Sequence, residues 1–246
     1  TFAPQIILND NVGNFVCRGE GEVALINLCN KLYQGESTNK IPNLWVKDNG
    51  SITKNQMGPI VNLNELPIPD YSLFDDHAIY RPMQGKIRRA IGIETMRGCP
   101  YTCTYCNSPS QVTVHKEETG ESFFRKKTIE KVREEIEYLH KLYNLELIFF
   151  IDDTFLAISK NRFEEFTTMY SDFKIPFWMN TRAETITEHR AAGLEEMNML
   201  RMDIGVEHGN AEYRKTYLKR NVSDEVQIKA FEMVADKKYT SSANCI

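Results

Sequence analysis

The chain has 246 residues, of which 41% are hydrophobic and 26% charged, values that are ordinary for a globular protein and exclude overall disorder. Its 30 basic and 34 acidic residues give a net charge of −4, which leaves no electrostatic case for a nucleic-acid partner. No apolar run approaches the roughly 18 residues that a membrane-spanning helix needs, so we expect no membrane span.

The first 35 residues predict a strand, a glycine-containing turn and a helix. Phe15-Val16-Cys17 has a strand pattern, residues 18–22 carry two glycines, and apolar positions at helical spacing run from Val23 to Leu32. This combination is the repeating unit of doubly wound sheets, and one such unit cannot bury a core by itself.

Residues 36–85 predict an irregular, proline-rich connector. Five prolines are spread through this segment, at positions 42, 59, 67, 69 and 82. The stretch from Leu66 to Tyr71 reads as extended, because each proline disfavours a helix at the residue before it.

From residue 86 onward, strand and helix patterns alternate with short links. Strands are expected at 90–95, 145–151, 175–180 and 202–207 and from 240, and helices at 128–143, 159–173, 187–197 and 223–235. In the first of these helices we expect Lys131 to pair with Glu135, after a solvated entrance at Arg125-Lys126-Lys127. The alternation predicts an α/β fold with a parallel sheet, and specifically a partial (β/α) barrel that is truncated at its C-terminus.

Three cysteines, Cys99, Cys103 and Cys106, follow the first of these strands with the spacing C-x3-C-x2-C. Thiolates are soft ligands that suit iron–sulfur clusters or zinc. A four-iron cluster ordinarily takes four cysteines, so three would leave one iron open to another ligand. A zinc site would instead need a fourth protein ligand, for which His115 is the nearest candidate. Clustered cysteines in a large chain without a visible leader predict metal binding in a reducing, cytoplasmic compartment.

This motif directly after a first strand resembles the radical S-adenosylmethionine superfamily. The resemblance implies a [4Fe-4S] cluster whose open iron chelates S-adenosylmethionine, and reductive cleavage of that cofactor to a deoxyadenosyl radical. It also implies a small-molecule substrate and an electron donor such as flavodoxin or ferredoxin. In the family, the aromatic residue before the third cysteine packs near the adenine, and Tyr105 has that position here.

Further candidate residues stand where the later strands end. Of Asp152-Asp153, we expect one to form a turn and the other to face the mouth of the barrel. Arg182 is a candidate to hold the carboxylate of S-adenosylmethionine. Glu207 matches the acid with which the family contacts the ribose and amino group of the cofactor.

Two neighbouring positions are expected to have structural or solvent-exposed roles. His208 stands where the family more usually has serine, so we expect a hydrogen-bonded structural residue. Leu218-Lys219-Arg220 is expected to be a solvated face. No residue is assigned a catalytic role.

The resemblance is strongest to the subgroup with an N-terminal cobalamin-binding domain. It rests on residues 18–22, 66–70, the cysteine motif, Asp152-Asp153 and residues 205–210. It implies that 1–35 are the C-terminal remnant of a cobalamin-binding-like, doubly wound domain, 36–85 the connector and 86–246 the core, with cobalamin bound in a full-length parent. The expected reaction is methylation or rearrangement of an unactivated carbon. A methylthiotransferase, or a non-catalytic iron–sulfur or zinc-binding interaction module, is the alternative.

Overall fold

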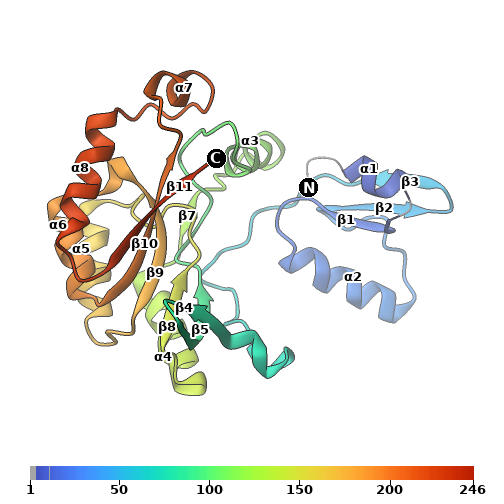
Figure 1. Cartoon of the computed structure of the whole chain (residues 1–246). Coiled ribbons are helices and arrows are strands. Elements are labelled where there is room, and N and C mark those ends of the chain that lie inside the picture. Colours follow the sequence, from blue (N-terminus) through green and yellow to red (C-terminus); the bar gives the residue numbers. More distant parts are fainter. Residues whose placement is uncertain (1–3, 11) are drawn as a thin grey trace. The chain divides into compact units, whose positions relative to one another are not determined.

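A computed structural model describes residues 4–10 and 12–246 (Figure 1). Residues 1–3 and 11 of the predicted N-terminal segment therefore lie outside the described residues. The chain forms two units, the first made of residues up to Leu66 together with Ser110–Phe123, and the second of Pro67–Pro109 together with Phe124–Ile246. Within the described ranges, every helix is too short or too polar to cross a membrane.

The first unit contains the predicted strand and helix, but its sheet is antiparallel. Its elements are α1 (Pro4–Asn9), β1 (Phe15–Cys17), α2 (Glu22–Gln34), β2 (Leu44–Asp48) and β3 (Ser51–Lys54). The strand order is β1-β2-β3, and both pairs are antiparallel. A small core of Ala24, Ile41, Leu44 and Val46 lies between α2 and this sheet. The origin of residues 1–35 in a cobalamin-binding domain stays a prediction.

The hairpin β2–β3 lies in the segment that we expected to be an irregular connector. Its turn is Asn49-Gly50, and both residues have positive φ angles, 47° and 80°. Such a pair favours a tight two-residue hairpin turn, whose twist matches that of the flanking strands. The structure therefore corrects the expectation for residues 44–54, since proline frequency concealed a turn signal that the sequence does contain.

The second unit is built on a six-stranded sheet that curls into a half-barrel (Figure 1). Its order is β11-β10-β9-β8-β5-β4, with β4 antiparallel to β5 and all other pairs parallel. The strands are β4 (Tyr80–Met83), β5 (Lys86–Ile93), β8 (Leu147–Phe150), β9 (Phe177–Arg182), β10 (Met199–Glu207) and β11 (Thr240–Cys245). This confirms the predicted α/β half-barrel.

Four helices cover one face of the half-barrel. They are α4 (Ile129–Tyr143), α5 (Lys160–Tyr170), α6 (Glu188–Glu196) and α8 (Asp224–Ala235). Each begins after a serine or threonine whose hydroxyl accepts a hydrogen bond from the amide three residues later, at Thr128, Ser159, Thr187 and Ser223. A hydroxyl there satisfies an amide that the first turn leaves unpaired, which is why the predicted starts are confirmed.

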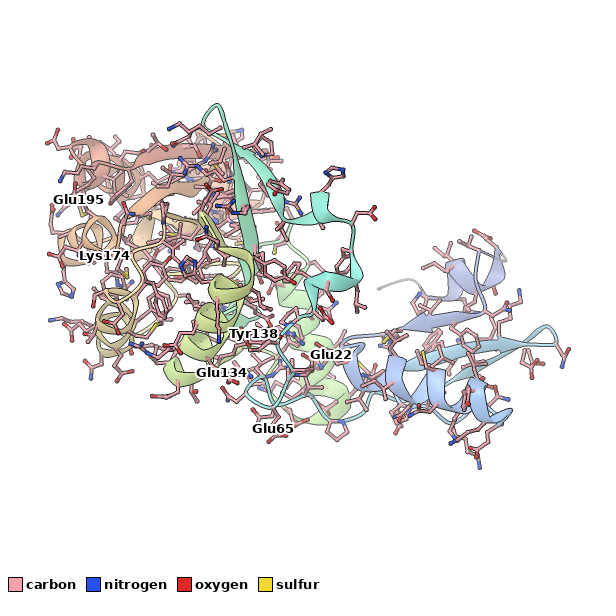
Figure 2. All side chains as sticks on the ribbon, turned by 90° about the horizontal axis from the view of Figure 1, so that it is seen from below. Glu22, Glu65, Glu134, Tyr138, Lys174 and Glu195 are labelled. Carbon is pink, nitrogen blue, oxygen red and sulfur yellow. The ribbon has the colours of Figure 1, made fainter. Side chains whose placement is uncertain are left out.

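The main core lies between these helices and the sheet. Phe150 of β8 is central to it, with its ring 5.0 to 5.8 Å from those of Phe155, Phe166, Tyr170 and Phe177. Helix α4 contributes Val132, Ile136 and Leu139, all buried, whereas Glu134 and Tyr138 on the same helix are exposed (Figure 2). The helix is therefore amphipathic at the predicted positions.

Besides β2 and β3, several elements were not predicted. They are α1, β4 in the expected connector, α3 (Ser108–Thr119), α7 (Ala211–Thr216), the antiparallel pair β6 (Met96–Arg97) and β7 (Arg125–Lys126), and three 3₁₀ turns at Tyr71–Leu73, Asp76–Ile79 and Ala183–Thr185. The pair β6–β7 matters for the site, since β6 leads directly into the cysteine motif.

Candidate functional site

A cavity of about 260 Å³ opens at the carboxyl edge of the parallel strands. It is lined by the ends of β9 and β10, by residues that follow β8, and by the loop after β6. All six residues predicted to hold a metal or a cofactor line it, namely Cys99, Cys103, Tyr105, Cys106, Arg182 and Glu207. Open α/β sheets bind ligands at this edge, so the fold brings the candidates together at its usual ligand position.

The cysteine loop is anchored to the segment that follows α7. The Thr104 backbone amide donates to the Leu218 carbonyl at 3.2 Å, and its hydroxyl donates to the Tyr217 carbonyl at 2.6 Å. Within the loop, the Cys106 amide donates to the Cys103 carbonyl at 3.3 Å. Two backbone hydrogen bonds and one from the Thr104 hydroxyl thus hold the loop that carries the three thiols.

The three thiols have different surroundings. Cys99 is buried, with its Sγ atom 3.5 Å from Thr154 Oγ1, and this burial raises the pKa of the thiol. Cys106 Sγ accepts a hydrogen bond at 3.4 Å from the Ser108 amide, at the first residue of α3. Cys103 Sγ faces the guanidinium groups of two arginines.

One of these arginines is Arg182, at the end of β9. Its Nη1 donates to Cys103 Sγ at 3.0 Å, and its Nε donates to Glu184 at 2.6 Å. The guanidinium also lies 3.8 Å from the centre of the Tyr101 ring. Burial lowers the pKa of Arg182, but Glu184 and Cys103 outweigh it, and the net shift is upward. Arg182 thus lines the cavity as a fixed cation.

The other is Arg220, which the sequence predicts to lie on a solvated face. That expectation is wrong, because Arg220 is 3% exposed and Leu218 is buried as well. Arg220 donates to the Gly205 carbonyl at 2.6 Å and to the Tyr105 hydroxyl at 3.2 Å. Its Nη1 lies 4.0 Å from Cys103 Sγ and 3.7 Å from Glu207.

Glu207 has a backbone conformation that is rare for a residue with a side chain. Its φ angle is +70°, and its carbonyl accepts from the Ile246 amide at 2.9 Å. A Cβ added at Gly205 would lie 2.5 Å from the Glu207 carboxylate, so glycine makes room for that side chain. Backbone strain of this kind clusters at ligand sites, and here it directs a carboxylate into the cavity.

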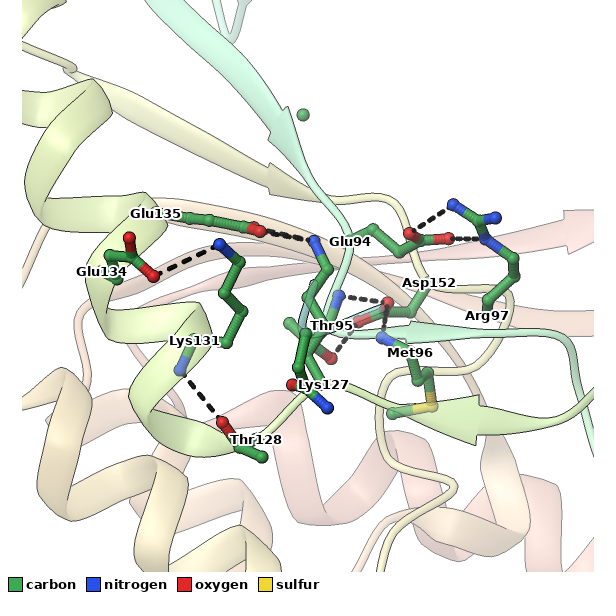
Figure 3. Close-up of polar contacts among 12 residues, drawn as sticks. Glu94, Thr95, Met96, Arg97, Lys127, Thr128, Lys131, Glu134, Glu135 and Asp152 are labelled. Atoms are coloured by element: carbon green, nitrogen blue, oxygen red, sulfur yellow. Dashed lines mark hydrogen bonds and ion pairs between the residues drawn. The ribbon is translucent and has the colours of Figure 1, made fainter. Parts of the chain in front are cut away.

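The two adjacent acids Asp152 and Asp153 both line the cavity. We expected one of them to form a turn, but the hydrogen bonds of the Asp152 carboxylate run to a distant segment. The Asp152 carboxylate accepts from the Thr95 amide at 2.8 Å, the Thr95 hydroxyl at 2.6 Å and the Met96 amide at 2.8 Å (Figure 3). Burial raises the pKa of Asp152 and these hydrogen bonds lower it. Burial has the larger effect, and the resulting pKa is about 7. Asp153 is exposed and lines the cavity. Asp152 therefore fixes the backbone that leads into the cysteine loop.

A buried ion pair supports the same region from the other side. Lys127 Nζ lies 2.8 Å from both carboxylate oxygens of Glu135, and both side chains are at most 7% exposed (Figure 3). Two expectations are therefore wrong: Lys127 is not solvated, and Lys131 pairs with Glu134 in place of Glu135. The Lys127 amide also donates to the Thr95 carbonyl, which joins this pair to the Asp152 contacts.

Neither of the two histidines considered from the sequence is among the residues that line the cavity. His208 accepts from the Asn210 amide at 3.1 Å and stacks on Tyr213, so it is hydrogen-bonded in its own turn, as predicted. His115, the candidate fourth zinc ligand, belongs to the first unit and stacks on Phe123. Across residues 4–10 and 12–246, no three His, Cys, Asp or Glu side chains are grouped as ligands of a single metal ion.

The cavity residues fit an iron–sulfur cluster by the chemistry of their donors. Three thiols of one loop share the cavity with two buried guanidinium groups. A cluster held by thiolates is anionic, and buried cations beside its ligands offset that charge. The Tyr105, Arg182 and Glu207 side chains complete the wall with an aromatic ring, a cation and a carboxylate.

Comparisons with known proteins agree with this arrangement. Residues 93–246 match the model of the Radical SAM superfamily. The chain is 28% identical over 215 residues to an uncharacterized methyltransferase of Pyrococcus horikoshii, covering 84% of the chain and 43% of the relative. It is 23% identical over 247 residues to the 4'-phospho-dehydrooxetanocin synthase of Priestia megaterium, covering 92% of the chain and 32% of the relative.

Two solved structures share the fold. The cobalamin-dependent S-adenosylmethionine radical enzyme OxsB superposes with a TM-score of 0.73 and 21% identity, over 100% of this chain and 35% of that one. The methyltransferase TsrM from Kitasatospora setae superposes with a TM-score of 0.66 and 15% identity, over 98% of this chain and 47% of that one. The chain thus spans less than half the length of these proteins. Since the family model covers more than half of the chain, the chain belongs to the radical S-adenosylmethionine superfamily.

Proposed function

We propose that this chain is the core of a radical S-adenosylmethionine enzyme in which Cys99, Cys103 and Cys106 hold a [4Fe-4S] cluster. The observation that carries the proposal is the convergence of these cysteines on one cavity at the carboxyl edge of the half-barrel. When bound, the cluster and S-adenosylmethionine would supply an electron and a deoxyadenosyl radical, which is chemistry that protein side chains cannot perform alone.

The residues of the cavity wall would orient the cofactor. Tyr105 presents an aromatic ring beside the third cysteine, in the position that the family uses against adenine. Glu207 offers a carboxylate to the amino group or ribose. Arg182 is already bonded to Glu184 and faces Cys103, so the structure supports a contact with the cluster ligand more directly than one with a free carboxylate.

The proposed reaction is methylation of an unactivated carbon in a small molecule. Methyltransferases among the relatives support this choice over rearrangement. Cobalamin is proposed for the full-length protein, since the OxsB and TsrM structures are described with cobalamin. A flavodoxin or ferredoxin is proposed as the electron donor.

The proposal is tested by anaerobic reconstitution with iron and sulfide. We expect about four irons per chain, a broad iron–sulfur absorbance band, and deoxyadenosine release when S-adenosylmethionine and a reductant are added. Cys103→Ala should lose the cluster, whereas Cys29→Ala, at an exposed position of α2, should retain it. A colourless protein that holds only zinc would contradict the proposal.

A further inference from the structure

Positive charge in the cavity is concentrated at one of the three thiols. Arg182 and Arg220 are 6% and 3% exposed, and both direct Nη1 toward Cys103 Sγ, at 3.0 and 4.0 Å. Cys99 is instead next to the Thr154 hydroxyl, and Cys106 accepts from a backbone amide. The three thiols therefore have different electrostatic environments, and the positive charge lies next to Cys103.

Both guanidinium groups are held in place by contacts on their far sides. Arg182 is bonded to Glu184 and lies over the Tyr101 ring. Arg220 is bonded to the Gly205 carbonyl and the Tyr105 hydroxyl. Its Nε is buried and has no hydrogen-bond partner among the described residues, so this cation is incompletely satisfied by the protein itself.

Glu184 and Glu207 pair with these two arginines and offset part of their positive charge. Glu184 has a side chain that is 26% exposed, so water screens it more than it screens Arg182, at 8%. Glu207 lies 3.7 Å from Arg220 Nη1. Of these four groups, the two cations are the ones that contact Cys103 Sγ.

We propose that Arg182 and Arg220 raise the reduction potential of the cluster by holding positive charge against the Cys103 thiolate. This rests on the proposed function, because it requires the cluster. Reduction adds one negative charge, and a nearby cation in a buried site stabilises the reduced form more than the oxidised one. The two arginines are thus tuning residues, and they make the electron easier to accept before the cofactor is cleaved.

The test is a redox titration of the anaerobically reconstituted chain, with the reduced cluster followed by electron paramagnetic resonance. Arg182→Gln and Arg220→Gln should each lower the equilibrium constant for cluster reduction about tenfold, which is about 59 mV for a one-electron couple. Arg182→Lys and Arg220→Lys keep the charge and should recover most of the shift. Arg133→Gln is the matched control, since it removes a charge from an exposed arginine that pairs with Glu137 and Asp172.

If a glutamine variant of Arg182 or Arg220 fails to load iron, a variant that is expected to shift the reduction potential in the opposite direction still tests the inference. Glu184→Gln removes the negative charge behind Arg182 and should make the cluster easier to reduce, by several-fold. Loaded glutamine variants with an unchanged potential, or a Glu184→Gln potential that is unchanged or lower, would overturn the inference while leaving the cluster assignment intact. A wild-type chain that binds no cluster would instead refute the proposed function.

Discussion

At the scale of single residues, the site depends on buried charges whose partners come from distant parts of the chain. Asp152 follows β8 but accepts from the backbone amides of Thr95 and of Met96, the first residue of β6. Arg220 follows α7 but reaches Gly205, Tyr105 and Cys103. Each of these side chains bonds one segment of the cavity wall to another. We therefore expect its removal to change the positions of the three cysteine thiols.

Asp152 predicts a specific dependence of stability on pH. Its carboxyl has a pKa of about 7 when folded and 3.8 ordinarily, so the folded state binds the proton more tightly. The free energy of unfolding should therefore fall as pH rises from about 4 to about 7, by at most about 1.4 kcal/mol per pH unit, and then level off. Asp152→Asn lacks this titration, so its deficit relative to wild type should shrink as pH rises.

The measurement is denaturant unfolding at pH 5 and at pH 8. The matched control is Asp153→Asn, which changes the neighbouring exposed acid and should follow the wild-type dependence. Parallel pH curves for wild type and Asp152→Asn would show that the carboxyl does not titrate in this range.

Single site residues could be predicted from the sequence where they belong to a short motif. They could not be predicted where contacts with distant segments of the chain bury them. The three cysteines, Tyr105 and Glu207 are found from short motifs, and the structure places them in one cavity. Arg220 and Lys127 stand in runs of basic residues that look solvated, and only the approach of other segments buries them. No local pattern carries that information.

At the scale of elements, the pair β6–β7 is attached to α4 by the buried contact between Lys127 and Glu135. This contact replaces the surface pair that helical spacing suggested, because Lys127, which precedes α4, donates from Nζ to both carboxylate oxygens of Glu135. Helix starts were predictable from their capping hydroxyls, since that interaction lies within four residues of sequence. The hairpin at Asn49-Gly50 was equally readable but was obscured by the surrounding prolines.

Lys127→Met should destabilise the second unit by about 3–5 kcal/mol, because it leaves the Glu135 carboxylate buried without its partner. The double variant Lys127→Met with Glu135→Leu removes both charges and should recover most of that loss. Denaturant unfolding of the two variants and the wild type measures the difference. If the double variant is as unstable as the single one, packing and not charge determines the cost.

At the scale of the whole molecule, the six-stranded sheet ends in two edges of different character. Strand β4 carries Arg81 and Pro82, and a charge and a proline both discourage pairing with another strand. Strand β11 has the sequence TSSANC, with neither a charge nor a proline, and most of its residues are exposed. The fold class was predictable because strands and helices alternate along the chain. The strands that form the edges were not predictable, because no single segment of the sequence determines the strand order.

In a protein made of these 246 residues alone, β11 is an edge strand, and we expect copies of it to associate there. We expect sedimentation velocity to show a weight-average mass that rises with protein concentration. Ala243→Lys places a charge on an exposed position of β11 and should reduce that rise, because pairing would then bury the ammonium group. Gln34→Lys adds the same charge at an exposed position of the first unit, the last residue of α2, and should leave association unchanged. Equal effects of the two lysines would mean that net charge, and not the free edge of β11, controls association.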